Sequence, residues 1–217
     1  ARLFRLGCIA ATACCLLPIV RKANAQQTND NHQPSPISRN GAMPDRLRIV
    51  MFGDSITNGA GVKEPETFRD IAQKELTRKL AKPVEVVNAG INGDIVTLAT
   101  QRLEKDVLNR KPDLVTVMFG GNEAGFYRPE TNGFAATPRV SRDAFKTALE
   151  TVVDRLQAAK ITVVLMTCPP MTDKYWGADL EPYQQNGINF LVKDYAQTMR
   201  DVARSEEHTS ELQSRFD

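Results

Sequence analysis

One segment decides the fold of this chain: LRIVMFGDSITNG, from Leu47 to Gly59. Its first part, Leu47 to Phe52, is a short apolar run that predicts a β-strand. A glycine-rich turn follows at once and carries Ser55. A hydroxyl in a tight turn at the end of a strand is exposed and can reach a ligand. The rest of the chain shows what kind of sheet this strand belongs to.

Apolar strands and amphipathic helices alternate after this segment. Strands are predicted at 47–52, 84–87, 113–119 and 161–167, and helices at 64–80, 95–108, 143–159 and 184–203. This alternation implies a parallel sheet with helices on both faces. Ligand sites in such sheets form at the carboxyl ends of the strands, so the segments that follow the strands are the ones to search.

Three of these segments together offer the groups that acyl transfer needs. Ser55 follows the first strand, Gly90 lies just after the second, and Asn122 follows the third. A serine hydroxyl can attack a carbonyl carbon, while a backbone N–H at Gly90 and the amide of Asn122 can stabilise the oxyanion that results. Each residue alone has an ordinary structural explanation: a helix cap, a turn glycine or a loop amide. Their occurrence at successive strand ends favours a catalytic site.

The same segments resemble a known family. FGDSITNG is similar to the first block of the GDSL (SGNH) hydrolases, NAGINGD to the second, and GGNE to the third, over roughly Arg46 to Ala203. The resemblance implies a flavodoxin-like three-layer α/β/α sandwich with a parallel sheet. It also implies that Ser55 is the nucleophile and that Gly90 and Asn122 are oxyanion donors. Glu123 replaces the aspartate of the family, a change expected to affect local loop bonding.

The resemblance ends before the family's last block. The family has an Asp-x-x-His after a fifth strand, and its histidine activates the serine. Here residues 204–217 follow the fourth helix, and their back-translation resembles a sequencing-library adapter. We therefore expect an incomplete hydrolase domain at 47–203, with its last strand and helix missing, and a non-native tail at 204–217. His208 lies three residues after Ser205 and not after an acid, so it is given no catalytic role.

The N-terminal residues predict export. Two arginines precede an apolar run that ends in Ala23-Asn24-Ala25, and these are the marks of a secretory signal peptide. We expect a signal peptide at 1–25, a polar linker at 26–46, a secreted or periplasmic protein, and no stable membrane insertion after cleavage. Cys8 raises a lipoprotein alternative, although Arg5-Leu6-Gly7 before it is a poor lipobox. Cys168 is then the single mature cysteine and is expected to be a buried thiol.

Composition excludes some functions and leaves others open. The 217 residues are 25% charged with a formal net charge of +2, and acidic and basic residues are interleaved, which does not indicate nucleic-acid binding. No cofactor or metal is implied. The sequence predicts a carboxylic ester hydrolase, a GDSL-type esterase, lipase or acetylesterase, acting on a small-molecule, polysaccharide or lipid ester. A carbohydrate- or nucleotide-binding module is the alternative, and the oligomeric state is left open.

Overall fold

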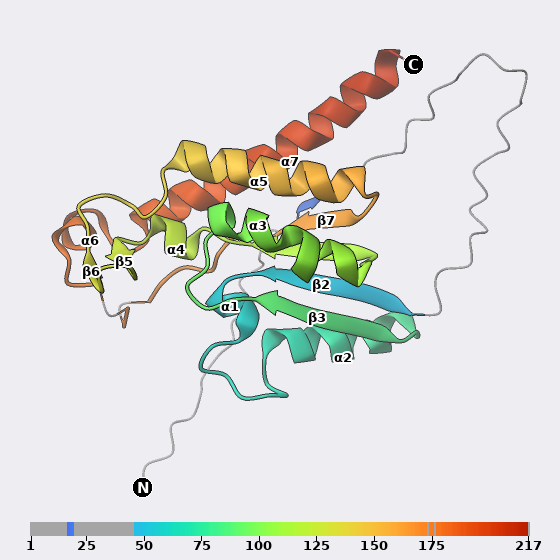
Figure 1. The fold of residues 1–217 in the computed structure, drawn as a ribbon, viewed down its shortest axis with the longest axis horizontal. Helices are drawn as coiled ribbons and strands as arrows, with labels where there is room; N and C mark the ends of the chain where they lie inside the picture. Colours follow the sequence, from blue (N-terminus) through green and yellow to red (C-terminus); the bar gives the residue numbers. More distant parts are fainter. Residues whose placement is uncertain (1–16, 20–45, 173, 176, 217) are drawn as a thin grey trace, which may run out of the picture.

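Four of the five strands of the main sheet run parallel in the computed structural model, which describes residues 17–19, 46–172, 174, 175 and 177–216. Of these, 17–19 and 206–216 are described by their backbone path alone. The strands are β2 (Leu47–Gly53), β3 (Val84–Gly90), β4 (Leu114–Met118) and β7 (Thr162–Leu165), adjacent in the order β3-β2-β4-β7 (Figure 1). The predicted parallel sheet is confirmed.

A short strand that the sequence did not predict borders β7. Residues Leu17–Ile19 form β1, which pairs antiparallel with β7, so that Leu17 lies opposite Leu165. This strand lies within the segment predicted as a signal peptide. Apart from β1 and Arg46, the predicted signal peptide and linker lie outside the described residues, and both stay predictions.

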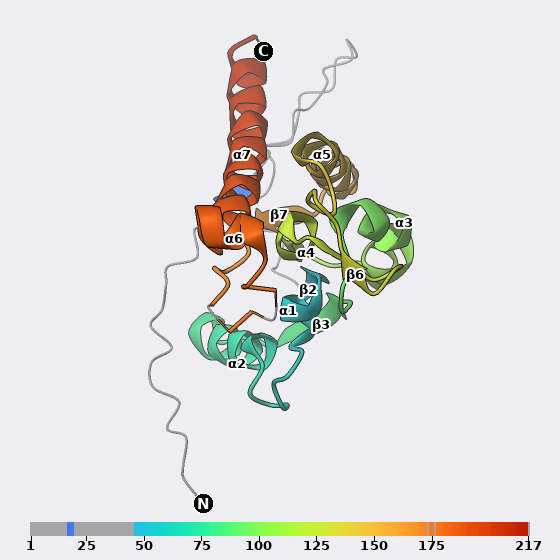
Figure 2. The same ribbon diagram turned by 90° about the vertical axis from the view of Figure 1, so that its left-hand side faces the viewer.

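Helices cover the two faces of the sheet unequally. They are α1 (Ser55–Asn58), α2 (Phe68–Leu80), α3 (Val96–Asp106), η1 (Leu108–Arg110), α4 (Gly121–Ala124), α5 (Arg142–Ala158), α6 (Glu181–Asn186) and α7 (Phe190–Phe216). Helices α3, α5 and α7 lie on one face, and α2 lies on the other (Figures 1 and 2). The result is the predicted three-layer α/β/α arrangement.

Alternation along β2 divides the core into two clusters. Val50 and Phe52 are buried in the large cluster with α3, α5 and α7, whereas Ile49 and Met51 belong to a small one against α2. Successive side chains of a strand point to opposite faces, which is why neighbours in sequence join different clusters. Cys168 is buried in the large cluster, as predicted.

The predicted fourth helix, 184–203, is wrong at both ends. Two helices, α6 and α7, replace it because Gly187 has a φ of 84° and ends α6. Helix α7 then continues without interruption to Phe216. Ala203 is its last buried residue among the side chains that the structure describes.

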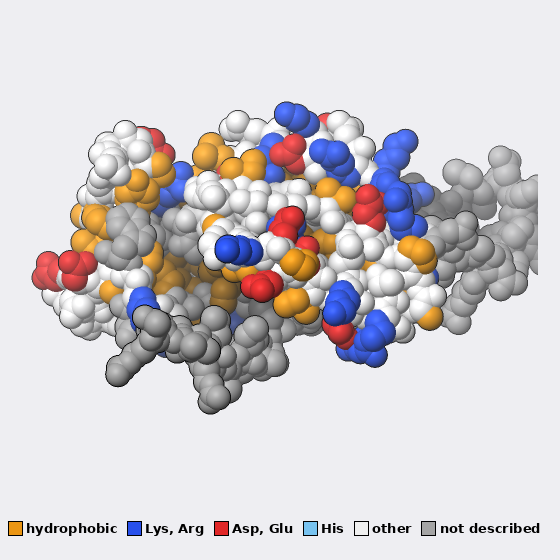
Figure 3. Space-filling model, turned by 90° about the horizontal axis from the view of Figure 1, so that it is seen from below, with side chains coloured by type: hydrophobic (Ala, Val, Ile, Leu, Met, Phe, Trp, Pro, Cys, Tyr) orange, Lys and Arg blue, Asp and Glu red, His pale blue; other side chains and the backbone are white. Residues whose placement is uncertain are grey.

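Short elements between β4 and α5 were not predicted. Helix α4 follows β4, and a small hairpin of β5 (Tyr127–Arg128) and β6 (Gly133–Phe134) comes next. Within the described part of the chain, no helix has both the length and the apolar character needed to cross a bilayer. On the α2 side of the molecule, acidic and basic side chains are interspersed (Figure 3).

Candidate active site

The sheet register brings the three predicted segments to one edge. Gly53 at the end of β2 pairs with Gly90 of β3 on one side and with Met118 of β4 on the other. The three strands therefore end at the same level, where α1 and α4 begin (Figure 1).

Ser55 is the first residue of α1. Asp54 caps this helix, because its Oδ1 accepts the Ile56 N–H at 2.9 Å and its carbonyl accepts the Asn58 N–H at 2.9 Å. Gly59 ends the helix with a φ of 76°. Ser55 is half-buried, and among the described residues neither its Oγ nor its N–H has a hydrogen-bond partner. A first-turn N–H has no acceptor inside its own helix, so both groups are available to a ligand.

Gly90 lies directly against the backbone of α1. A Cβ at this position would lie 2.4 Å from Asn58 N and 2.8 Å from the carbonyl oxygen of Asp54. Its φ is not among the positive ones, so close approach, and not a left-handed conformation, requires glycine here. The Gly90 N–H donates to Asn88 Oδ1 at 2.9 Å. To serve as an oxyanion donor it would exchange this exposed side-chain acceptor for the ligand.

Asn122, on α4, turns toward the Ser55 segment. Its Nδ2 donates to the carbonyl of Asp94 at 2.8 Å and makes a longer contact of 3.4 Å with Asp54 Oδ2. The first bond fixes the amide. The second hydrogen has only the weak partner, so it is the one that can turn to a substrate oxygen.

Two buried carboxyl groups, those of Asp54 and Glu123, are the sequence neighbours of Ser55 and Asn122. Burial, with a smaller contribution from the charge of Asp94, raises the pKa of Asp54 to about 6. Burial also raises the pKa of Glu123 to about 7. Glu123 is fully buried and accepts two N–H groups, those of Val96 at 2.6 Å and Gly120 at 2.8 Å. It thereby ties the start of α3 to the start of α4.

Sequence reasoning gave Glu123 only a local role and missed Arg102 altogether. Arg102 lies on α3 with its side chain 14% exposed, and it contacts the ends of β2 and β3. An arginine in an amphipathic helix pattern is ordinarily assigned to the surface, and no local signal in the sequence identifies it as buried.

The structure describes the side chain of neither histidine. His32 lies outside the described residues, and His208 lies in the part of α7 that is described by its backbone alone. Within the described residues, no group of three or more His, Cys, Asp or Glu side chains could hold a metal ion.

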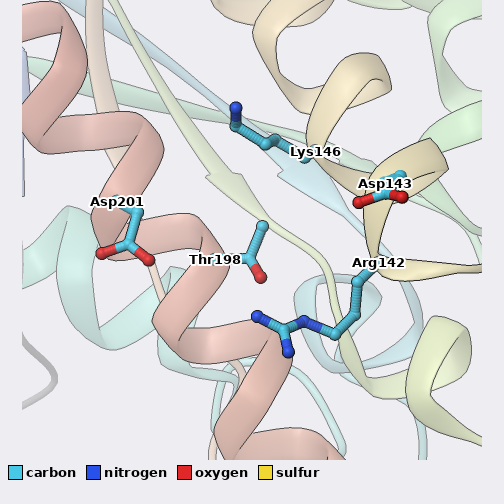
Figure 4. Close-up of a pocket in the computed structure, with 5 residues that line it drawn as sticks. All are labelled: Arg142, Asp143, Lys146, Thr198 and Asp201. Carbon is cyan, nitrogen blue, oxygen red and sulfur yellow. The ribbon is translucent and has the colours of Figure 1, made fainter.

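A polar hollow lies elsewhere, between α5 and α7. It has a volume of about 550 Å³ and is lined by Arg142, Asp143, Lys146, Thr198 and Asp201 (Figure 4). None of the three predicted site residues lines it. The hollow and the candidate active site are therefore separate features.

Solved structures resemble the fold described above. The acetyl xylan esterase AlAXEase superposes with a TM-score of 0.58 and 26% identity over 74% of each chain. A lipase/acylhydrolase from Enterococcus faecalis superposes with a TM-score of 0.53 and 28% identity, over 74% of this chain and 73% of that one. Both belong to the class of α/β hydrolytic enzymes that the fold and the strand-end groups indicate.

Sequence comparison identifies the family. The GDSL-like lipase/acylhydrolase family matches residues 51–209, and the chain belongs to this family. It is 30% identical over 172 residues to the uncharacterized lipoprotein YqeF of Bacillus subtilis (strain 168), covering 72% of this chain and 66% of YqeF. It is 32% identical over 84 residues to an acetylxylan esterase of Geobacillus stearothermophilus, covering 39% of this chain and 37% of the esterase. The chain thus spans less than two thirds of the length of either relative.

Proposed function

We propose that this protein is a carboxylic ester hydrolase with Ser55 as its nucleophile. The observation that carries the proposal is the arrangement at the start of α1. Among the described residues, the Oγ and N–H of Ser55 have no hydrogen-bond partner there, Gly90 packs on one side of the helix, and the Asn122 amide contacts its capping residue, Asp54. A nucleophile with N–H donors on the neighbouring strand-end segments is the arrangement that acyl transfer requires.

In the proposed reaction, Ser55 Oγ adds to the ester carbonyl carbon and passes its proton to a general base. The carbonyl oxygen becomes an oxyanion, held by the N–H groups of Ser55 and Gly90 and by Asn122 Nδ2. The bond to the alkoxy group then breaks, and the alcohol leaves with the proton. Water releases the acid from the acyl-serine in a second addition and elimination. The proposed base is a histidine of the Asp-x-x-His kind that the family has, and neither His32 nor His208 is proposed for this role.

The relatives suggest a substrate class. One sequence relative and one structural relative are acetylxylan esterases, so acetyl esters of carbohydrates are the proposed substrates. Export from the cytoplasm, which the N-terminal residues predict, would bring the enzyme to such polymers. The B. subtilis relative is named as a lipoprotein, so an exported location is proposed for this chain too.

Labelling with a fluorophosphonate probe tests the proposal on the product of the complete gene. The wild-type protein is expected to be labelled at Ser55 and to release acetate from acetylated xylan. Ser55→Ala is expected to lose both. A wild-type protein that binds acetylated xylan but neither reacts with the probe nor releases acetate would instead be a binding module.

A further inference from the structure

The side chain of Arg102 connects the ends of two strands. Its Nη1 donates to the carbonyl of Ala89 at 2.9 Å, and its Nη2 donates to the carbonyl of Gly53 at 3.1 Å. The guanidinium carbon lies 4.5 Å from the centre of the Phe52 ring. One planar group thus joins Gly53, the last residue of β2, to Ala89, the residue before Gly90 at the end of β3.

The same guanidinium holds the loop that binds Asn122. Its Nε and Nη2 lie 2.8 and 2.7 Å from Oδ2 of Asp94, whose side chain is only 8% exposed. The backbone carbonyl of Asp94 accepts the Asn122 amide at 2.8 Å. Arg102 therefore binds a residue next to each proposed donor. It binds Gly53, two residues before Ser55, and Ala89, the residue before Gly90. It also binds Asp94, whose carbonyl accepts the Asn122 amide.

We infer that Arg102 is a positioning residue that sets the spacing of the oxyanion donors on Ser55, Gly90 and Asn122. This inference rests on the function proposed above. The guanidinium is suited to the role because its five N–H donors have a fixed geometry and can bind several acceptors at once. A lysine ammonium keeps the charge opposite Asp94 but cannot span both carbonyls and the carboxylate in one plane.

A positioning role and a purely structural role differ in what they change. Oxyanion donors act mainly in the transition state, so their displacement should lower kcat and leave KM almost unchanged. A misplacement of about 1 Å can cost on the order of 10²-fold in rate. A residue that only stabilises the fold would instead reduce the folded fraction, and the molecules that remain folded would keep their kcat.

The experiment compares Arg102→Lys with Arg48→Lys. Arg48 makes the same kinds of contact at the other end of β2: its Nε donates to Glu85 at 2.8 Å, and its Nη1 donates to the carbonyl of Arg110 at 2.6 Å. Both variants remove a guanidinium that joins a carboxylate to a backbone carbonyl, but one lies next to the site and the other far from it. A second variant, Arg102→Met with Asp94→Asn, removes both charges of the Arg102–Asp94 pair together, so that neither is left unpaired. The other carboxylate partner of Arg102, Asp106, lies 3.3 Å from Nη1 and is 25% exposed, so that water can solvate it in this variant.

Turnover of p-nitrophenyl acetate and the rate of fluorophosphonate labelling are measured on each protein, with the folded fraction determined by near-ultraviolet circular dichroism. We expect Arg102→Lys and the double variant to lose about 10²-fold in kcat and in labelling rate, with KM within about twofold of wild type. Arg48→Lys should keep both rates.

Three outcomes would overturn the inference. In the first, Arg102→Lys keeps the kcat of Arg48→Lys once the folded fraction is corrected for. In the second, both Arg102 variants fail to fold, which would assign the residue to the framework. In the third, only KM changes. Failure of the proposed function looks different, because wild type would then react no faster with the probe than Ser55→Ala does.

Discussion

Asp54 and Ser55 are neighbours with separate roles in the same turn. Asp54 is 2% exposed and uses its carboxylate to cap α1, and this bond fixes the direction of the helix. Ser55 takes no part in the cap, so its hydroxyl and N–H stay available. The ordinary reading of an Asp-Ser pair after a strand is a helix cap. In this turn the cap and the candidate nucleophile are both present, on adjacent residues.

Replacing Asn122 with alanine should affect turnover far more than stability. We expect kcat to fall by roughly 10²–10³, as for the loss of one oxyanion donor. Loss of the hydrogen bond to Asp94 should cost about 1 kcal/mol in the free energy of unfolding. Both are measured on the same preparation, by ester turnover and by urea unfolding.

Asn189→Ala is the matched control for this prediction. Asn189 braces a loop through two hydrogen bonds to the backbone of Met171, at 2.7 and 2.9 Å, and should therefore affect stability alone. Normal kcat together with a large loss of stability in Asn122→Ala would remove Asn122 from the site.

Gly90→Ala should lower both turnover and stability. The added methyl group would lie 2.4 Å from Asn58 N, a backbone atom, so α1 and Ser55 must move to make room for it. Gly133→Ala is the control, since its nearest neighbour would lie at 3.6 Å, an ordinary contact, and its φ is not positive. Enzyme assays and thermal melts compare the two variants. Equal turnover and equal melting temperatures of Gly90→Ala and Gly133→Ala would contradict the prediction.

The site residues differ in how far the sequence could predict them. Ser55, Gly90 and Asn122 could be proposed from the sequence because parallel strands bring their carboxyl ends to one edge, and because their motifs resemble those of a family. Arg102 and Glu123 act through contacts with segments that are distant in sequence, such as Gly53 and Val96. Periodicity reports which face of a helix is apolar, but it says nothing about which buried polar side chain meets which backbone group.

Among the elements, long periodic ones were predicted and short ones were missed. The strand predicted at 113–119 is observed as β4 and the helix predicted at 143–159 as α5, with a shift of one residue at each end. Helices α1 and α4 have four residues each, too few to show a helical period. The break at Gly187 was missed because a glycine within an apolar pattern does not reveal its φ.

Glu123 joins the starts of α3 and α4, and its raised pKa predicts that the stability of the fold depends on pH. Carboxyl groups of the unfolded chain release their protons near pH 4 to 4.5, whereas the buried Glu123 has a pKa of about 7. Between these values the folded protein binds more protons than the unfolded chain does. The free energy of unfolding should therefore fall as the pH rises from about 4.5 to about 7, and Asp54, with a pKa of about 6, should add to the decrease.

Glu123→Gln should reduce this decrease, because a glutamine cannot ionise. It should also be less stable than wild type at pH 5, since its amide can accept from only one of the two N–H groups at Val96 and Gly120. Urea unfolding at pH 5 and pH 7.5 measures both effects. Glu66→Gln, at an exposed position, is the control and should keep the wild-type decrease. An undiminished decrease in Glu123→Gln would show that Glu123 is not its source.

At the scale of the whole molecule, the two layers of helices differ in packing. Helix α5 buries six apolar side chains: Phe145, Ala148, Leu149, Val152, Val153 and Leu156. The one buried residue of α2 is Arg69, while Phe68, Ala72 and Leu76 are only partly buried. The layer formed by α2 therefore contributes much less apolar burial than the opposite layer does.

Substitutions in the two layers should differ accordingly. Leu149→Ala should lower the free energy of unfolding by about 2–5 kcal/mol, the usual cost of deleting a fully buried leucine. Leu76→Ala should cost less, about 1 kcal/mol, because less apolar surface is lost from a half-buried site. Urea unfolding of both variants makes the comparison. Equal losses would show that the α2 layer is packed as firmly as the other.

The thin α2 layer also has a consequence for motions of the native state. A helix with few buried apolar contacts can detach without dismantling the rest of the domain, whereas β2 and β4 are covered by the large core and can open only when the whole fold does. Amide deuterium exchange should then divide the backbone into two populations. The amides of α2 should exchange through a local opening of low free energy, and those of β2 and β4 only through global unfolding. Because Thr67, the capping residue of α2, lies close to Gly59 at the end of α1, each such opening would also loosen the turn that holds Ser55.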